Sequence, residues 1–435
     1  MTYDEALAYL AGLNTFGIQL GLTRISRLLE LMGNPERQFK SIHVTGTNGK
    51  GSTTAMLSAI LVASGIKTGM YTSPHLVDYT ERLAIDGQPV AREDFAAAIE
   101  YTSRQVARLL ELGGEQPTEF EVLTAAAFYW FARCRVEYAV IEVGLGGLLD
   151  STNVIIPELC VITNVTIDHI DRCGATVAEI THHKAGIIKE RVPVVTSAEG
   201  EALELIGRTA AGKAAPLYRW GEDFTASFVK FQGQLQTIDI QAGVWEKQER
   251  FALPLLGAHQ VKNAAVAVAA AWLFSRQEKR VSDRTIRDGL LQVSWPGRFE
   301  FVGDKPVFVI DGAHNLAGVQ ALRDNLDSLF PGRPITFLLG ILRDKDVAGM
   351  TKTLIRSCDR VVVVAPLSER AGEPAEVAAL ITAELVKTAD SIEAGLQEVF
   401  LLAGENGIVC AAGSLYLIGE VRRRTLSGQI QNNQV

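Results

Sequence analysis

The sequence contains no apolar run long enough to cross a membrane: the near-continuous stretch 264–274 falls short of the roughly 20 residues that a spanning helix needs. The N-terminus lacks the basic start and apolar stretch of a signal peptide. The net charge is −8, which argues against nucleic-acid binding as the main role. We therefore expect a cytoplasmic protein that binds neither membranes nor nucleic acid.

Cysteine is also scarce. The chain has five cysteines, an odd number without Cys-x-x-Cys spacing, so we expect neither a disulfide framework nor a cysteine-based metal site. No Gly-x-Gly-x-x-Gly follows an apolar strand, which argues against a hydride-transferring enzyme of the Rossmann type. With 435 residues, 47% of them hydrophobic and 21% charged, the chain has the composition of a globular enzyme with at least two domains.

Apolar strands alternate with helical patterns along most of the chain, which predicts an α/β fold with parallel sheets covered on both faces. Residues 224–240 instead alternate with a period of two and predict an antiparallel hairpin or small sheet. The proline and glycine of Trp295-Pro296-Gly297-Arg298 indicate a boundary, so we expect domains at 1–295 and 296–435. In the first domain the expected strands are 42–44, 67–73, 138–143, 159–163 and 192–196.

The second domain repeats the alternation on a smaller scale, which predicts a doubly wound, Rossmann-like sheet. Its expected strands are 307–311, 335–339, 360–364 and 407–411. Its expected helices are 316–329, 347–357, 376–387 and 414–424.

A glycine-rich stretch, Gly46-Thr47-Asn48-Gly49-Lys50-Gly51-Ser52, lies between the first strand and a helix-like run. Glycines let backbone N–H groups approach an anion, and the helix N-terminus adds its positive end. Lys50 supplies a full charge, and Ser52 can reach a phosphate-bound Mg²⁺. Val44 stands where the Walker spacing requires glycine, so the stretch predicts a variant phosphate loop, the alternative being a glycine-rich turn with a chance lysine.

Polar side chains follow several other strands. Ser73, Glu142 and His169 offer a hydroxyl, a carboxylate and an imidazole, which suit a hard cation at the carboxyl ends of a parallel sheet. Singly, Ser73 and His169 are better explained as ordinary surface residues. Glu142 ends an apolar strand and is harder to explain without a cation or a strong donor. By pattern alone Lys184 is a helix-face residue and Asn315 a helix cap.

Together these motifs resemble the folylpolyglutamate synthase/dihydrofolate synthase family of the Mur ligase superfamily over nearly the whole chain. The motifs that carry the resemblance, beside the glycine-rich stretch, are Thr72-Ser73-Pro74-His75-Leu76, Glu142-Val143-Gly144-Leu145-Gly146-Gly147, Asp168-His169, Lys184-Ala185-Gly186, His259-Gln260 with Asn263, Trp295-Pro296-Gly297-Arg298, Asp311-Gly312-Ala313-His314-Asn315, Asp344-Lys345-Asp346 and Gly413-Ser414-Leu415-Tyr416.

The resemblance implies an N-terminal P-loop ATPase domain, a C-terminal glutamate-ligase domain, and ATP and Mg²⁺ as cofactors. The ATP-binding residues it implies are Gly46, Thr47, Asn48, Gly49, Lys50, Gly51, Ser52, Asn263, Arg298 and Asp311. The metal ligands it implies are Ser52, Ser73, Glu142, His169 and Lys184, the last matching a lysine that carries a carbamate in this family. The implied catalytic residues are Lys50, Lys184, Asp311 and His314, and the implied folate-binding residues are Thr118, Phe120 and Asp150.

The implied reaction joins L-glutamate to the carboxylate of tetrahydrofolate or a folylpolyglutamate through an acyl phosphate, and dihydropteroate is a second candidate acceptor. We expect small-molecule partners and a monomer. Three residues depart from the family pattern: Leu148 replaces an arginine, His183 a glutamate and Leu316 a proline. The alternatives are a related ligase for a cell-wall or cyanophycin acceptor, and a nucleotide-binding homologue that has lost catalysis.

Overall fold

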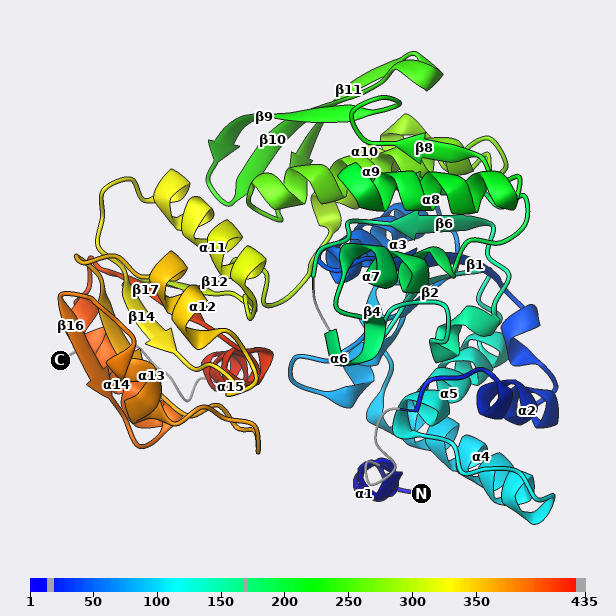
Figure 1. The fold of residues 1–435 in the computed structure, drawn as a ribbon, viewed down its shortest axis with the longest axis horizontal. Helices are drawn as coiled ribbons and strands as arrows, with labels where there is room; N and C mark the ends of the chain where they lie inside the picture. The colour runs from blue at the N-terminus through cyan, green and yellow to red at the C-terminus, as the bar shows by residue number, and fades with distance from the viewer. Residues whose placement is uncertain (14–18, 168–169, 428–435) are drawn as a thin grey trace. The chain divides into compact units, whose positions relative to one another are not determined.

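The computed structural model describes residues 1–13, 19–167 and 170–427 and divides the chain into two compact units (Figure 1). The first unit comprises Met1–Pro254 and Gln260–Ser294, and the second comprises Leu255–His259 and Trp295–Val435. The units differ from the predicted ranges by Trp295 and by the segment Leu255–His259. This segment packs within the second unit, because a Cβ atom added at Gly257 would lie only 2.3 Å from Asn325 Oδ1.

The first unit is built on an eight-stranded sheet in which all but the β2–β3 and β3–β4 pairs are parallel. In spatial order its strands are β4 (Gln88–Pro89), β3 (Leu83–Ile85), β2 (Thr68–Tyr71), β5 (Tyr138–Glu142), β1 (Lys40–Thr45), β6 (Leu159–Ile162), β7 (Val194–Thr196) and β8 (Leu217–Arg219). The predicted α/β architecture is confirmed. Strand β1 lies at the centre between β5 and β6, and five of its six residues are buried.

Helix α3 contacts β1, β2 and β5, and two hydrophobic cores join further helices to the sheet. One core packs α1, α2, α4 and α5 together with residues of β5, and contains Leu10, Ile25, Phe95 and Phe128. A second core places α7 and α8 against β6 and β7, through residues such as Ile206. Figure 1 shows α4 and α5 lying side by side. The helices of the first unit are α1 (Tyr3–Leu13), α2 (Thr23–Leu31), α3 (Lys50–Ala63), α4 (Arg92–Glu111), α5 (Glu119–Arg133), α6 (Ile170–Cys173), α7 (Val177–Ala185), α8 (Gly200–Gly212), α9 (Ala258–Phe274, which starts in Leu255–His259) and α10 (Asp283–Gln292).

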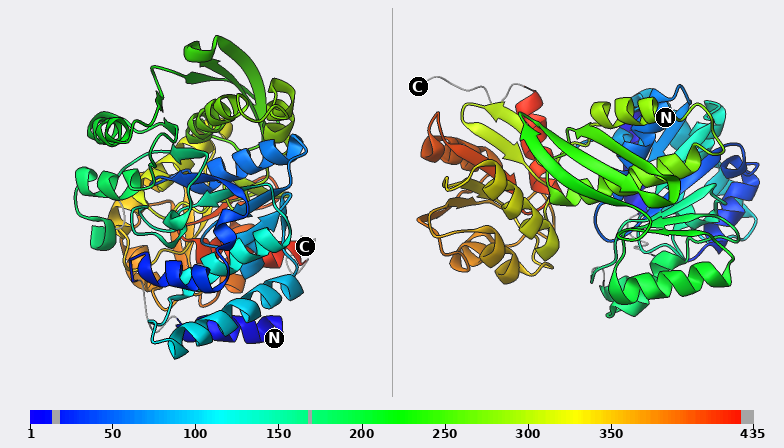
Figure 2. Two further views of the ribbon diagram at one scale, coloured as in Figure 1. Left: turned by 90° about the vertical axis from the view of Figure 1, so that its right-hand side faces the viewer. Right: turned by 90° about the horizontal axis from the view of Figure 1, so that it is seen from above.

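An antiparallel three-stranded sheet is added to the first unit, as the alternating pattern predicted (Figure 2). Its strands are β9 (Thr225–Gln232), β10 (Leu235–Ala242) and β11 (Lys247–Leu253). The central strand β10 buries every second residue, including Ile238 and Ile240, which is the signature of a sheet with one covered face. Helix α10, which contacts β11, approaches α3 so closely that a Cβ atom at Gly289 would lie 2.5 Å from Ile60 Cα.

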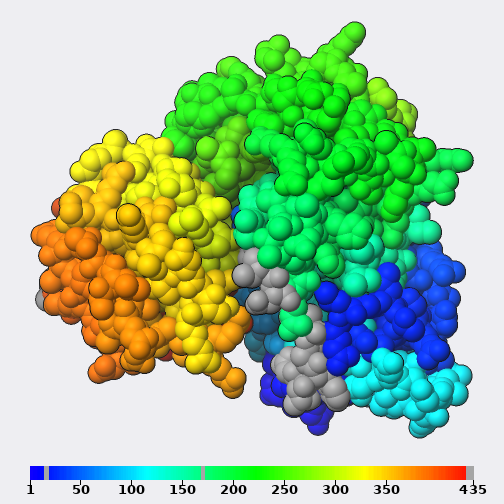
Figure 3. All heavy atoms as spheres, in the orientation of Figure 1, coloured from blue at the N-terminus to red at the C-terminus, as the bar shows by residue number. Residues whose placement is uncertain are grey.

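The second unit contains a six-stranded sheet, parallel except for its first pair. In spatial order its strands are β12 (Glu300–Asp304), β13 (Val307–Ile310), β17 (Ile408–Ala412), β14 (Thr336–Leu339), β15 (Arg360–Val363) and β16 (Leu385–Thr388). Its helices are α11 (Leu316–Leu329), α12 (Val347–Leu354), α13 (Pro374–Ala379), α14 (Ile392–Ala403) and α15 (Leu415–Leu426). Helices α11 and α12 contribute to the yellow surface that faces the viewer in Figure 3.

One predicted element of the second unit is wrong. The expected helix 376–387 is replaced by the shorter α13 and, after a break, by β16. Strand β16 contains a valine and a threonine, which favour extended structure, and it pairs in parallel with β15. Among the described residues no helix is both long enough and apolar enough to cross a membrane.

Candidate active site

The phosphate loop, Gly46–Ser52, follows β1 directly and leads into α3, which begins at Lys50 within the loop. Two of its glycines have backbone angles that disfavour side chains, with φ of +152° at Gly46 and +83° at Gly49. There is also no room for a side chain: a Cβ atom at Gly46 would lie 1.8 Å from Thr163 Oγ1, and one at Gly49 would lie 2.3 Å from Asn263 Oδ1. Glycine is therefore required at both positions.

Two lysine ammonium groups meet on a single carbonyl oxygen of this loop. Lys50 Nζ donates to Gly46 O at 3.0 Å and to Thr47 O at 3.1 Å. Lys184 Nζ, which is buried on α7, donates to the same Gly46 O at 2.7 Å. Positive charge concentrated beside a helix N-terminus creates a strong attraction for an anion. This convergence links a predicted phosphate-binding lysine to a lysine that its helix pattern alone would assign to an ordinary helix face.

Residues after β6 fix the shape of the phosphate loop and were not among the predicted site residues. The backbone N–H of Thr47 donates to Asn164 O at 2.8 Å, and that of Asn48 donates to Asn164 Oδ1 at 3.0 Å. The Thr163 hydroxyl donates to Asn48 O at 2.7 Å. Thr47 and Asn48 thus support the loop through their backbones, and their predicted contacts with ATP stay predictions.

Helix α9 contributes a buried amide pair next to the phosphate loop. Gln260 Nε2 donates to Ser52 Oγ at 3.1 Å, and Asn263 Nδ2 donates to Gln260 Oε1 at 3.1 Å. Because Asn263 also lies against Gly49, this pair connects the start of α3 to a residue predicted to contact the nucleotide. Gln260 orients both partners.

Two of the predicted metal ligands, Ser73 and Glu142, lie at the carboxyl ends of neighbouring strands of the first sheet. Glu142 ends β5 and is only 4% exposed, and its Oε2 accepts the backbone N–H of Ser73 at 3.2 Å. Strands β2 and β5 pair in parallel, so Ser73 and Glu142 emerge at the same sheet edge. His169 lies outside the described residues. A buried carboxylate with serine hydroxyls fits the oxygen ligands that Mg²⁺ prefers. This set contains a single carboxylate, and no cluster of three His, Cys, Asp or Glu side chains suited to a metal occurs among the described residues.

A second glycine loop, Gly144–Asp150, follows Glu142. Asp150 is 3% exposed and accepts hydrogen bonds from Leu145 N at 2.8 Å, Thr152 N at 3.0 Å and Thr152 Oγ1 at 2.5 Å. Burial raises the pKa of the Asp150 carboxyl, and these donors oppose the rise. The carboxylate thus holds the loop to the residues after it, and its predicted contact with folate stays a prediction.

The other two predicted folate-binding residues lie at the start of α5. Thr118 is the N-cap, accepting from Glu121 N at 3.3 Å, while Glu121 accepts from Thr118 N at 2.7 Å. Phe120 lies against the second glycine loop, because a Cβ atom at Gly144 would lie 2.4 Å from its ring. The Tyr71 ring is 6.1 Å from the Phe120 ring. The structure therefore brings Phe120 and the second glycine loop together and gives Thr118 a capping role.

In the second unit, the other predicted site residues gather around Gly312. A Cβ atom at Gly312 would lie 2.3 Å from Arg298 Nη1. Asp311 directly follows β13 and accepts from Phe299 N and Ala313 N, both at 2.8 Å. Burial raises the pKa of its carboxyl, while the Arg298 guanidinium acts in the opposite direction. His314 Nδ1 lies 2.8 Å from Gly312 O and must carry the proton in that bond, because a carbonyl only accepts.

The three departures from the family pattern have simple surroundings. Leu148 and His183 are joined by a backbone hydrogen bond, Leu148 N to His183 O at 2.7 Å. Leu316 is the first residue of α11, which Asn315 caps by accepting from Gly318 N. The first helical position has no intrahelical use for its N–H, so leucine and proline both fit there. The predicted capping role of Asn315 is confirmed.

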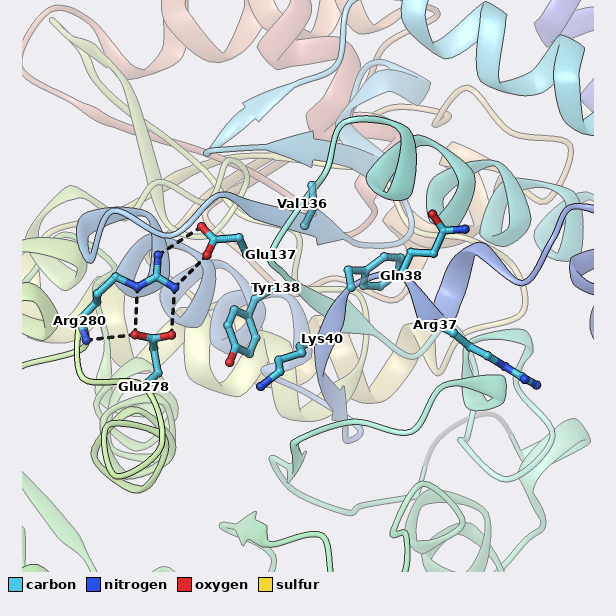
Figure 4. Close-up of a pocket in the computed structure, with 9 residues that line it drawn as sticks. Arg37, Gln38, Lys40, Val136, Glu137, Tyr138, Glu278 and Arg280 are labelled. Carbon is cyan, nitrogen blue, oxygen red and sulfur yellow. Dashed lines mark hydrogen bonds and ion pairs between the residues drawn. The ribbon is translucent and has the colours of Figure 1, made fainter.

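A hollow of about 430 Å³ lies at the amino ends of β1 and β5, away from the phosphate loop (Figure 4). Arg280 there pairs with Glu137 and Glu278, both at 2.9 Å, and Lys40 lies over the Tyr138 ring. The charged groups thus satisfy one another, whereas ligands of parallel sheets bind beyond the carboxyl ends of the strands. The phosphate-loop end is the candidate active site.

This combination of a parallel α/β sheet, a glycine-rich loop with converging lysines and a neighbouring buried carboxylate defines an enzyme that binds phosphates. The Mur ligase middle domain matches residues 44–271, and the Mur ligase glutamate ligase domain matches residues 297–415. The chain therefore belongs to the Mur ligase family, and it is a ligase.

Full-length relatives place the chain more closely. It is 34% identical to the dihydrofolate synthase/folylpolyglutamate synthase of Bacillus subtilis, over 97% of this chain and 99% of that protein. It is 37% identical to the folylpolyglutamate synthase of Lacticaseibacillus casei, over 99% of this chain and 100% of that protein. A structure of the Mycobacterium tuberculosis folylpolyglutamate synthase with ADP and AMPPCP superposes with a TM-score of 0.87 and 32% identity, covering 97% of this chain and 99% of that one. The predicted resemblance is confirmed.

Proposed function

We propose that this ligase uses ATP to join L-glutamate to the terminal carboxylate of tetrahydrofolate or of a folylpolyglutamate. The observation that carries the proposal is the convergence of Lys50 and Lys184 on Gly46 O, next to the buried Glu142 carboxylate. The positive charge of Lys50, the Lys184 side chain and an oxygen ligand of the kind that Mg²⁺ prefers thus lie around one loop, which suits the transfer of a phosphoryl group. The names of the full-length relatives give the products, folylpolyglutamate and dihydrofolate, and the proposed acceptors are the precursors of those products.

Phosphorylation is needed because a carboxylate is a poor electrophile. A carboxylate oxygen of the folate attacks the γ-phosphorus of ATP, the bond to ADP breaks, and an acyl phosphate forms. The amino group of L-glutamate then attacks the acyl carbon, loses a proton and expels inorganic phosphate, which leaves an amide. ATP, acceptor and glutamate thus become ADP, phosphate and the extended folate.

The residues of this chain contribute charge and position. Lys50 neutralises charge on the transferred phosphoryl group, and electrostatic stabilisation of this kind is the main protein contribution to such a step. Ser73 and Glu142 would hold Mg²⁺ together with Ser52, and when bound the ion would offset phosphate charge and orient the phosphates. Lys184 would add a ligand to this set as a carbamate.

Residues of the second unit and of the second glycine loop would complete substrate binding. Arg298, Asp311 and His314 would bind ATP and the incoming glutamate. Phe120 and the second glycine loop would bind the pterin side of the acceptor. Dihydropteroate is proposed as a second acceptor, because the Bacillus subtilis relative is named for both activities. One chain carries both sets of residues, which supports a working monomer.

Phosphate release tests the proposal. The intact protein is supplied with MgATP and L-glutamate, and with tetrahydrofolate, dihydropteroate or no acceptor, and the product is identified by its mass. Release with tetrahydrofolate alone indicates a dedicated polyglutamate synthase, and release with both acceptors a bifunctional enzyme. Release with neither would overturn the proposal in favour of another acceptor or of lost catalysis, with Leu148 as the first position to examine.

The metal assignment has its own test. Glu142→Ala should raise the Mg²⁺ concentration needed for half-maximal activity at least about tenfold, because a ligand oxygen is lost. Glu137→Ala is the matched control, since Glu137 precedes the other end of β5 and is exposed. An unchanged Mg²⁺ titration in a folded Glu142→Ala protein would contradict the assignment.

A further inference from the structure

Strand β1 holds the second glycine loop as well as leading into the phosphate loop. Residues 43 and 45 are two apart on the strand, so their side chains point to the same face. His43 Nε2 lies 2.9 Å from Thr152 Oγ1, just after the second glycine loop. Thr45 Oγ1 donates to Gly146 O within that loop at 2.7 Å. The side chains of His43, Thr45 and Thr152 are all fully buried.

The direction of the hydrogen bonds follows from the number of protons available. Thr152 has one hydroxyl proton and donates it to Asp150 Oδ1 at 2.5 Å. Thr152 Oγ1 must therefore accept from His43, so the Nε2 atom of His43 carries a proton. Burial lowers the pKa of His43 to about 3, which leaves the ring neutral and Nδ1 without a proton. Nδ1 is buried without a hydrogen-bond partner among the described residues, which agrees with this tautomer.

The chain of hydrogen bonds ends on the backbone of the second glycine loop. Asp150 accepts from Thr152 through Oδ1 and from Leu145 N through Oδ2 at 2.8 Å. Hydrogen bonds are thus donated from His43 to Thr152 and from Thr152 to Asp150, and the backbone N–H of Leu145 donates to the other oxygen of Asp150. Leu145 lies three residues after Glu142, so the chain fixes the backbone between the proposed metal ligand and the residues that would face the acceptor.

We propose that His43 and Thr45 are positioning residues that fix the second glycine loop relative to the phosphate loop. Both side chains belong to the strand that ends in the phosphate loop, so both loops take their position from one rigid element. Neither residue touches a reacting atom. They act through Thr152, Asp150 and Gly146, and the inference rests on the proposed function in assigning the acceptor to the second glycine loop.

A role in packing alone does not account for this arrangement. An unpaired polar nitrogen in the protein interior carries a free-energy penalty, and an apolar side chain of similar size would fill the position without it. The benefit of histidine is a directional donor at one end of a buried hydrogen-bond chain. Direction and register are what a positioning residue supplies.

Substitution of Thr152 tests the proposal. Thr152→Val keeps the shape but removes the hydroxyl, so Asp150 loses one donor and His43 loses its acceptor. We expect the KM for the folate acceptor to rise about tenfold, which corresponds to loss of a buried hydrogen bond to a charged group. The KM for ATP should stay within about twofold, because the phosphate loop keeps its own hydrogen bonds. Thr152→Ser, which retains the hydroxyl, should behave like the wild type.

His43 variants provide the second arm. His43→Leu should raise the acceptor KM similarly, and combining it with Thr152→Val should add little, because both changes break one chain. His43→Gln keeps a side-chain N–H and should recover part of the effect. Ile42→Val is the matched control, since Ile42 is buried on the opposite face of β1 and should leave both KM values unchanged. Equal changes in the two KM values, or none in a folded Thr152→Val protein, would overturn the proposal.

A spectroscopic measurement separates this inference from the proposed function. In protein labelled with ¹⁵N-histidine, the signal that His43→Gln removes should show a protonated Nε2 and an unprotonated Nδ1. A protonated Nδ1 would overturn the hydrogen-bond chain whether or not the enzyme is active. Absence of ligation with every acceptor, together with the expected tautomer, would instead count against the proposed function alone.

Discussion

Two loops lie side by side at the carboxyl edge of the first sheet, because β1 and β5 pair in parallel and each leads into one of them. In the phosphate loop, charged side chains rest on backbone carbonyl oxygens, as Lys50 does on Gly46 and Thr47. In the second glycine loop, a buried carboxylate, Asp150, holds backbone and side-chain donors. The phosphate loop thus presents charged groups, whereas buried hydrogen bonds hold the second glycine loop in a fixed position.

The difference predicts separate consequences for activity and stability. A substrate anion can replace a carbonyl as the partner of a half-buried lysine without leaving a buried polar group unpaired. Loss of the Asp150 carboxylate or of its hydrogen-bond partners leaves buried donors or acceptors unsatisfied, and each of these has a free-energy penalty. Mutations in the phosphate loop should therefore affect turnover, and mutations around the second loop should affect folding as well.

The largest expected effect is on turnover. Lys50→Ala should reduce glutamate-dependent phosphate release at least about a hundredfold, because a charge that stabilises the transferred phosphoryl group is lost. Its melting temperature should stay close to that of the wild type. Lys67→Ala, at an exposed position after α3, is the control and should keep full activity. A folded Lys50→Ala protein with normal turnover would remove the phosphate loop from the mechanism.

Gly144→Ala should show the different behaviour of the second glycine loop, because it should lower stability. The new Cβ atom would lie 2.4 Å from the Phe120 ring, so the ring or the loop must move. We expect the free energy of unfolding in denaturant to fall by about 1–3 kcal/mol, as for other overpacked positions. Gly207→Ala on α8 is the control, since its nearest neighbour would be 3.9 Å away. Equal stability of the two variants would show that the second loop is not rigidly packed.

The pH dependence of stability should depend on His43. The pKa of His43 is 6.5 in the unfolded chain and about 3 in the folded protein, because burial disfavours the charged ring. The stability that comes from the neutral ring is fully present above pH 6.5 and is lost as the pH falls from 6.5 towards 3. The free energy of unfolding should decrease by about 1.4 kcal/mol per pH unit more in the wild type than in His43→Gln over this range. Denaturant unfolding at several pH values measures the slope, and identical slopes would mean that His43 is not buried as a neutral ring.

The smallest expected effect concerns the N-cap of α5, the helix whose Phe120 packs against the second glycine loop. Thr118→Ala should lower the free energy of unfolding by about 1 kcal/mol, because the capping bond to Glu121 N is lost. Thr118→Ser keeps the cap and should be nearly unchanged. A raised acceptor KM with unaltered stability in Thr118→Ala would instead identify Thr118 as a direct folate ligand.

The alternating strands and helices, the strand–glycine loop–helix arrangement around residues 46–52 and the family could all be predicted from the sequence, because their signals are local motifs in a fixed order. The connections inside the site could not. Asn164 binds Asn48 from 116 residues away, and His43 meets Thr152 across 109 residues, so nothing near either residue indicates its partner. Strand β16 was missed for a similar reason, since its extended form depends on pairing with β15.

The route of the chain between the two compact units affects how the protein could be divided or recombined. The segment Leu255–His259 belongs to the second unit although residues on both sides of it belong to the first. A fragment starting at Trp295 would lack this segment and leave the α11 surface around Asn325, against which Gly257 packs, uncovered. The glutamate-ligase domain is therefore not a module that one cut can release, and exchanging it between ligases requires transplanting a five-residue insert along with it.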